Sequence, residues 1–204
     1  ALHRVFSLFI VCGMIFTVPK VSIAKPIQGV DTTVFQSLES ITQLGGGVTT
    51  VIPDNGLAYI GQGNHVVILD VSSPNNPIQI GQSAPLDSDV TDLVILDQTA
   101  YVATGYGPTY VMDLSDSIQP KVVQTLEDVH AGRLFLFTHY LLAGLQYNAA
   151  NVILDISNPF APVKSAEYPD LGAVDMVMTG ARAYFLLPTG IKVVDFTSPA
   201  SPKE

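Results

Sequence analysis

The sequence predicts an all-β protein, a β-propeller of four-stranded antiparallel blades, with about four blades in this chain. Two observations predict this fold. First, an Asp that ends an apolar run recurs at spacings of 43, 42 and 40 residues, and a Pro follows each Asp seven residues later. Second, each period divides into short apolar runs separated by turn residues, and helical periodicity is sustained nowhere. The recurring pairs are Asp70/Pro77, Asp113/Pro120, Asp155/Pro162 and Asp195/Pro202.

The first unit shows the pattern of four strands. Asn55-Gly56 separates the first two strands, and Asn-Gly is a strong hairpin signal because both central positions of a type I′ turn need positive φ. Ser-Ser-Pro ends the third strand. The expected strands are Val48–Pro53, Leu57–Gly61, His65–Val71 and Ile78–Ser83.

The later units repeat this pattern. Their third strands are nearly unbroken apolar runs, as expected for strands buried on both faces between neighbouring blades. The expected strands are Val90–Leu96, Ala100–Thr104 and Tyr110–Leu114 in the second unit, Arg133–Phe137, Tyr140–Gly144 and Asn151–Ile156 in the third, and Ala173–Thr179, Ala183–Leu187 and Ile191–Phe196 in the fourth.

The expected domain organisation is a signal peptide at 1–24, a leader at 25–33 and propeller repeats at 34–204. The fourth unit lacks an outer strand, and the segment 34–44 has the length and pattern to supply it. Two arrangements follow: the chain closes as four blades, or it forms part of a ring of six to eight blades and is a fragment. The expected blades span about 48–89, 90–128, 129–172 and 173–204.

The first residues have the features of an export signal. His3 and Arg4 precede the apolar run Val5–Val18, and Ser22 and Ala24 are the small residues of a cleavage site. The run is shorter than the ~20 residues of a membrane span. We therefore expect a secreted, periplasmic or cell-surface protein without a membrane span in the mature chain, an uncleaved anchor being the alternative. The single Cys of the sequence lies in this run, so the mature chain forms no disulfide.

The composition restricts the classes of partner. Apolar residues make up 48% of the chain, which argues against disorder, and the formal net charge is −9. Nucleic acids and anionic membranes require a basic surface, and no basic cluster occurs. We expect a protein or carbohydrate partner instead.

Three elements recur in the units: an Ala-Tyr strand, an apolar strand that ends in Asp, and a turn with Ser and Pro. This pattern resembles the LVIVD-repeat family over residues 45–204. It departs from the family where Leu141 replaces the Tyr and where Asp116-Ser117 replaces Asn-Pro. The resemblance implies an exported β-propeller and carries over no catalytic residue. The matching pieces are Ala58-Tyr59, Ala100-Tyr101 and Ala183-Tyr184, then Val67–Asp70, Val152–Asp155 and Val193–Asp195, then Ser72–Pro74, Ser157–Pro159 and Thr197–Pro199.

The recurring carboxylates are expected to be structural. An Asp at the end of a strand can accept a hydrogen bond from a backbone N–H of the turn that follows, in an Asx turn. This role is assigned to Asp70, Asp113, Asp155 and Asp195.

A second set of carboxylates suggests a metal site. Alignment of the units places Thr50, Asp92, Gly132 and Asp175 in one column at the start of the innermost strands, with Asp87, Asp89 and His130 nearby. Carboxylate oxygens are the ligands that Ca²⁺ prefers. The hypothesis is a calcium site formed by Asp92, Asp175 and Asp89, and the alternative is a channel mouth with solvated carboxylates.

Aromatic residues in the loops between strands are candidates for recognition, because exposed aromatic side chains suit sugar or protein contacts. The alternative is simple loop packing. Tyr59, Tyr101 and Tyr184, in contrast, are expected to pack between blades. The candidate binding residues are Tyr106, Tyr110, Tyr147 and His130.

The leading functional hypothesis is a non-enzymatic interaction or scaffold module that binds its partner through a loop face, because no nucleophile, base or cofactor motif stands out. The alternative is a hydrolase or lyase at the channel mouth, with or without a metal, built from Asp92, Asp175 and His130. A purely structural role in a larger polypeptide is a third possibility.

Overall fold

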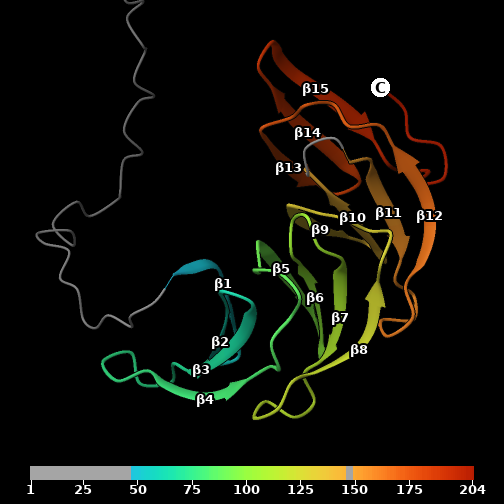
Figure 1. The fold of residues 1–204 in the computed structure, drawn as a ribbon. Helices are drawn as coiled ribbons and strands as arrows, with labels where there is room; N and C mark the ends of the chain where they lie inside the picture. The colour runs from blue at the N-terminus through green and yellow to red at the C-terminus, as the bar shows by residue number, and fades with distance from the viewer. Residues whose placement is uncertain (1–46, 146–148) are drawn as a thin grey trace, which may run out of the picture. The chain divides into compact units, whose positions relative to one another are not determined.

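The computed structural model describes residues 47–145 and 149–204, which form fifteen strands in four antiparallel sheets (Figure 1). The all-β prediction is confirmed, and most strand boundaries agree within two residues. The strands are β1 (Val48–Asp54), β2 (Leu57–Gln62), β3 (His65–Asp70), β4 (Ile78–Gln82), β5 (Asp92–Leu96), β6 (Thr99–Ala103), β7 (Thr109–Asp113), β8 (Lys121–Leu126), β9 (Arg133–Phe137), β10 (Tyr140–Gly144), β11 (Asn151–Asp155), β12 (Val163–Tyr168), β13 (Asp175–Thr179), β14 (Arg182–Leu187) and β15 (Gly190–Asp195).

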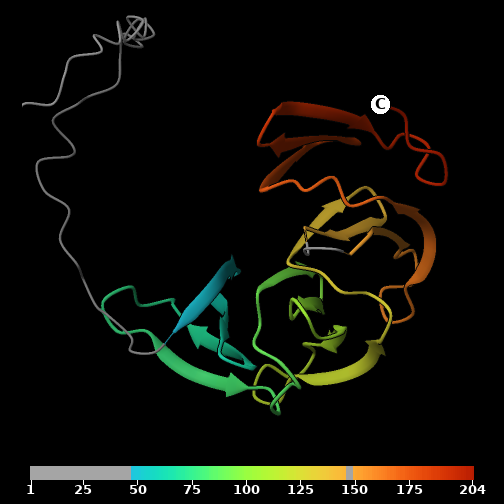
Figure 2. The same cartoon turned by 45° about the horizontal axis from the view of Figure 1, so that its top comes forward.

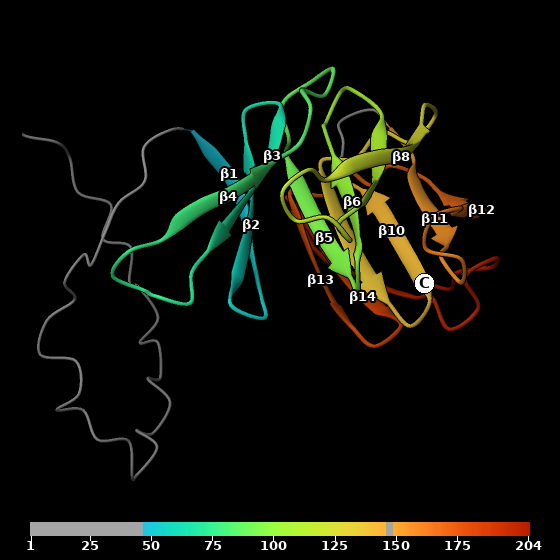
Figure 3. The same ribbon diagram turned by 90° about the horizontal axis from the view of Figure 1, so that it is seen from below.

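Within each sheet the strands pair in sequence order, so each sheet is a simple meander (Figures 2 and 3). The four sheets are β1–β4, β5–β8, β9–β12 and β13–β15. In the first three sheets a β-bulge interrupts the pairing of the third and outer strands at equivalent places. Because a bulge bends its strand and increases the local twist, the outer strand curves in the same way in each sheet.

The hairpin between the first two strands of each sheet depends on one special backbone position. Asn55, Asp97 and Thr138 have φ of 46°, 52° and 50°, and Gly180 has a φ of 60° at the equivalent place. Asn, Asp and Gly tolerate this left-handed region, whereas a β-branched Thr adopts it only under constraint. The Asn-Gly hairpin is therefore one instance of a turn that all four units share.

The hydrophobic core lies between neighbouring sheets, where one face of each sheet packs on the opposite face of the next. Between the first and second sheets, Tyr59 and Ile68 pack against Val102 and Met112. The next two sheet pairs bury equivalent side chains. Full burial of an aliphatic side chain stabilises a fold by ~1.5–3 kcal/mol, so these interfaces provide most of the stabilisation.

The fourth sheet has three strands within the described residues, and a single bridge marks where an outer strand begins. Lys203 pairs with Asp195 and exchanges both backbone hydrogen bonds with it. Ile78, Lys121 and Val163 begin the outer strands of the other sheets in the same register. Lys203 thus occupies the first position of the strand that the sequence analysis assigned to 34–44, a segment outside the described residues.

One face of the fourth sheet is exposed. It carries Val177, Tyr184, Leu186, Ile191 and Val193, with Val177 60% and Ile191 70% exposed. Strand pairing places these residues at the positions by which the first three sheets pack on the sheet that follows. For example, Tyr184 corresponds to the fully buried Tyr101. The exposed surface is therefore a sheet-to-sheet interface without a following sheet among the described residues.

The proposed signal peptide at 1–24 and the leader at 25–33 also lie outside the described residues. Within the part of the chain that the structure describes, no helix has the length and apolar character needed to cross a membrane.

Candidate functional site

Asp92, the central residue of the proposed calcium site, connects three sheets. The residue is only 8% exposed. Oδ1 accepts hydrogen bonds from the hydroxyl of Thr50 in the first sheet, at 3.3 Å, and from the N–H of Leu93, at 3.0 Å. Oδ2 accepts a hydrogen bond from the N–H of Leu134 in the third sheet, at 2.9 Å. Both oxygens are thus occupied by protein donors, which is a structural role.

The structure does not bring the other proposed calcium ligands to Asp92. Asp175 is exposed and accepts a hydrogen bond from the N–H of Met176, at 2.9 Å, and Asp89 is exposed in the loop before β5. Among residues 47–145 and 149–204, no three His, Cys, Asp or Glu side chains gather in a way that could hold a metal ion. Asp92, Asp175 and Asp89 are therefore not brought together as a ligand set in the part of the chain that the structure describes.

Strand pairing corrects two positions of the repeat alignment. Thr50 pairs with Gly61, Asp92 with Ala103, and Arg133 with Gly144, so Arg133 rather than Gly132 belongs to the column of Asp92. In the third unit the residue at the Tyr position is likewise Leu142, not Leu141. A shift of one residue exchanges the two faces of a strand. The third sheet therefore contributes the cationic side chain of Arg133 to this column, in place of the hydrogen atom of Gly132.

The four repeated carboxylates all adopt one geometry. Each accepts a hydrogen bond from the backbone N–H two residues later, which defines an Asx turn. The hydroxyl of Ser157 also donates to Asp155, and hydrogen bonds from the following Ser or Thr hold the pKa of each carboxyl below its usual value. The N–H donors are Ser72 to Asp70 at 2.9 Å, Ser115 to Asp113 and Ser157 to Asp155 at 2.8 Å, and Thr197 to Asp195 at 2.7 Å.

The proposed binding residues do not form one surface. Tyr106 is a loop residue and 83% exposed. Tyr110, in contrast, lies in β7 with its ring in the core, and its hydroxyl donates to Asp87 Oδ2 at 2.9 Å. Its expected place in a strand is confirmed, whereas its role as an exposed loop aromatic is wrong. His130 is half-buried with Nδ1 2.9 Å from the carbonyl oxygen of Gly107, and because a carbonyl only accepts, Nδ1 carries the proton. Tyr147 lies outside the described residues.

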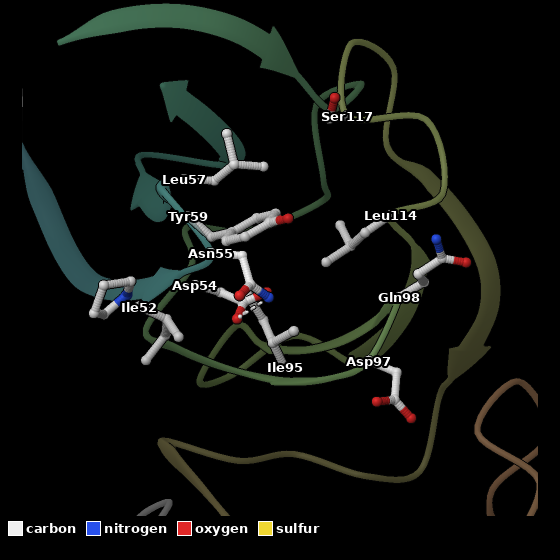
Figure 4. Close-up of a pocket in the computed structure, with 11 residues that line it drawn as sticks. Ile52, Asp54, Asn55, Leu57, Tyr59, Ile95, Asp97, Gln98, Leu114 and Ser117 are labelled. Carbon is white, nitrogen blue, oxygen red and sulfur yellow. Dashed lines mark hydrogen bonds between the residues drawn. The ribbon is translucent and has the colours of Figure 1, made fainter. Parts of the chain in front are cut away.

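A cavity lies elsewhere in the described residues, between the hairpin ends of the first two sheets (Figure 4). We call it the inter-blade pocket, and its volume is about 610 Å³. Figure 4 shows the side chains of both sheets around a common space, with the Tyr59 hydroxyl directed between Leu57 and Leu114. The pocket is lined by Ile52, Pro53, Asp54, Asn55, Leu57 and Tyr59 of the first sheet and by Ile95, Asp97, Gln98, Leu114 and Ser117 of the second.

A difference between the repeats explains why the pocket is open. Asp54 stands at the hairpin end of β1, where the next two sheets have Leu96 and Phe137, and both of these pack into apolar clusters. In the following gap the Tyr101 hydroxyl also donates to the carbonyl oxygen of Pro159, at 3.0 Å. The first gap has a shorter, polar side chain in place of an apolar one, so the two sheets leave space at this end.

The pocket combines negative charge with an apolar wall. Asn55 Nδ2 donates to Asp54 Oδ1 at 2.9 Å, which leaves the second carboxylate oxygen of Asp54 for a ligand. Burial and then the charge of Asp54 raise the pKa of Tyr59, so the phenol is neutral at ordinary pH. This site was not predicted from the sequence, although the replacement of an apolar residue by Asp54 is visible once the repeats are aligned.

Comparison with known proteins agrees with this fold. The LVIVD repeat matches at residues 46–83 and 148–170, and no curated protein matches the sequence. The β-propeller domain of Myceliophteria thermophila Cps50 (Swd1) is similar with a TM-score of 0.61 and 15% identity over 78% of this chain and 55% of that one. The computationally designed protein Ika8 is similar with a TM-score of 0.58 and 12% identity over 77% of this chain and 48% of that one.

The chain therefore spans about half the length of these two proteins, and at such identities the likeness concerns the fold alone. A second designed protein, Ika4, is similar with a TM-score of 0.56 and 13% identity, and 78% of this chain covers 96% of that one. The predicted propeller fold and the predicted repeat family are both confirmed. This chain has a β-propeller fold and carries LVIVD repeats at residues 46–83 and 148–170.

Proposed function

We propose that this chain is a non-enzymatic binding module, in which the propeller is the scaffold and the inter-blade pocket receives part of a protein or glycan partner. One observation carries the proposal: the first and second sheets leave a cavity of about 610 Å³ between their hairpin ends. Ligand pockets typically have volumes of ~300–1,000 Å³ and combine an apolar lining with a few polar groups.

The chemistry of the lining favours recognition over catalysis. Its hydroxyl groups are those of Tyr59 and Ser117, and the eleven lining residues include no His, Lys or Cys. A hydroxyl nucleophile requires a neighbouring base that removes its proton. The carboxylates and amides of the rim can instead orient a ligand by hydrogen bonds while Leu57 and Leu114 contact its apolar part.

Export from the cell is the second part of the proposal and rests on the sequence of residues 1–24. It is tested by expression of the chain with these residues in a bacterial host, followed by fractionation and N-terminal sequencing. A product that begins at Lys25 outside the cytoplasm supports export. A product that keeps residues 1–24 in the cytoplasm contradicts it.

The binding function is tested with a library of small molecules and oligosaccharides. Thermal shifts are recorded in parallel for the wild-type chain and for Asp54→Leu, which places in the first sheet the residue that closes the next gap. A ligand of the pocket raises the melting temperature of the wild-type protein only, because a ligand that binds the folded state stabilises it. Ligands that stabilise both proteins equally, or none at all, contradict the proposal. Asp128→Leu, an exposed position outside the pocket, is the control for added surface hydrophobicity.

A further inference from the structure

The inter-blade pocket has a rim of one charge. Asp54 and Asp97 contribute two carboxylates from opposite sheets, and no Lys, Arg or His is among the lining residues. One oxygen of Asp54 accepts from Asn55, and within the described residues Asp97 has no hydrogen-bond or ion-pair partner. Two carboxylates without a cation beside them repel an anionic ligand and attract a cationic one.

A second observation is an unpaired hydroxyl group that faces the pocket. Tyr59 is only 6% exposed, and its hydroxyl has no hydrogen-bond partner among the described residues. The equivalent hydroxyl of Tyr101 donates to the carbonyl oxygen of Pro159. Among the described residues no buried side-chain oxygen or nitrogen lacks a partner, so the Tyr59 hydroxyl lies at the accessible surface of the cavity, where water or a ligand can hydrogen-bond with it (Figure 4).

The wall of the pocket is apolar. Ile52 and Leu57 line it from the first sheet, and Ile95 and Leu114 from the second. Alkyl ammonium and guanidinium side chains bury a hydrocarbon stem along such surfaces while the charged group contacts polar atoms. The order of groups in the pocket, with carboxylates at the rim and the phenol oxygen inside, fits a short stem with a cationic end.

From these observations we propose that the inter-blade pocket binds an alkyl ammonium or guanidinium group, which donates hydrogen bonds to Asp54 and to the Tyr59 hydroxyl while its stem contacts Leu57 and Leu114. The inference rests on the proposed binding function and names the chemistry of its ligand. Two sources supply this group: a free amine, or the Lys or Arg side chain of a peptide.

The test is titration of the full chain with matched probes, followed by amide chemical shifts and calorimetry. The probes are n-pentylamine, n-pentanol and pentanoate, which share a stem and differ in charge, and blocked lysine and a blocked Lys-containing tripeptide for the second source. We expect the amine to bind more tightly than the alcohol and pentanoate not to bind. Asp54→Asn preserves shape and removes charge, and we expect it to weaken amine binding about tenfold. Tyr59→Phe removes only the hydroxyl, and we expect a several-fold loss.

The outcomes separate the inference from the function on which it rests. Binding of the alcohol or of a sugar at the pocket, without preference for the amine, overturns the cationic ligand and leaves the binding function standing. If neither neutral nor charged probes shift the amides of the pocket, both proposals fail. Tighter binding of the tripeptide than of n-pentylamine identifies a protein side chain as the source, whereas the reverse order identifies a free amine. Asp54 is half-exposed and Asn has nearly the same shape, so we expect Asp54→Asn to fold like the wild-type protein. An unchanged midpoint of unfolding checks this.

Discussion

Replacement of Asp92 by Ala is expected to destabilise the chain far more than replacement of Asp175, although the two residues occupy the same column. Asp92→Ala removes three hydrogen bonds, of which those from Thr50 and Leu134 connect the second sheet to its two neighbours. The N–H groups of Leu93 and Leu134 are then left buried without a partner. Each costs ~1.5 kcal/mol, whereas the half-exposed Thr50 hydroxyl can turn to water, so the sum is about 3 kcal/mol.

Asp175→Ala is the matched control. The Asp175 carboxylate is exposed and accepts one hydrogen bond, from Met176, so water can replace it. The expected loss is below about 1 kcal/mol. Both variants are unfolded in urea with circular dichroism detection, and the free energies are compared by linear extrapolation. An Asp92→Ala loss no larger than that of Asp175→Ala would refute the reasoning that this carboxylate joins three sheets.

Three further predictions follow from the packing and the titrating groups. Gly81→Ala places a Cβ against the backbone oxygen of Ser117, and we expect a loss of ~1–3 kcal/mol in urea unfolding, whereas Gly47→Ala, which meets open space, is expected to be neutral. The lowered pKa of Asp155 stabilises the folded state above the unfolded pKa of about 3.8, and this stabilisation is lost as the pH falls through the folded pKa. Asp155→Asn should therefore reduce the loss of folding free energy at acidic pH. An unchanged dependence of stability on acidic pH contradicts the role of the Asx turn. Burial raises the pKa of Tyr101 to about 12, so its contribution to folding stability is present below pH 10.0 and lost as the pH rises through about 12. In an ultraviolet titration, Tyr101→Phe should lack the step near pH 12 that the wild-type protein shows. Loss of a step near pH 10.0 instead contradicts the burial of this phenol.

The fold was predictable because the repeat states the same strand pattern four times. Turns such as that at Asn55-Gly56 can be predicted because their conformation depends on the local residues. The strands can be predicted because their pattern of apolar residues follows their burial. The boundaries were less certain at strand ends: β5 begins at Asp92, not at Val90, because the residues before it cross between sheets. No local pattern marks such a crossing.

The site was harder to predict, because the contacts that decide it join residues about 42 positions apart. Sequence placed Asp92 in the correct column but could not show that backbone donors of two other sheets occupy its oxygens. Tyr110 resembled a loop aromatic until strand pairing placed its ring inward. The pocket arises from one departure from the repeat, Asp54, and a departure is visible only against a correct alignment.

The packing between sheets has a direction, since the face that carries Tyr59 meets the face that carries Val102, and the two faces differ in their residues. An interface of this kind is heterologous, so it propagates in one sense and each added unit presents the same face again. Duplication of a repeat can therefore lengthen such a protein without the evolution of a new contact surface. The exposed face with Val177 and Ile191 is the surface on which a further unit would pack. In any preparation that leaves it uncovered, we expect association to increase with protein concentration.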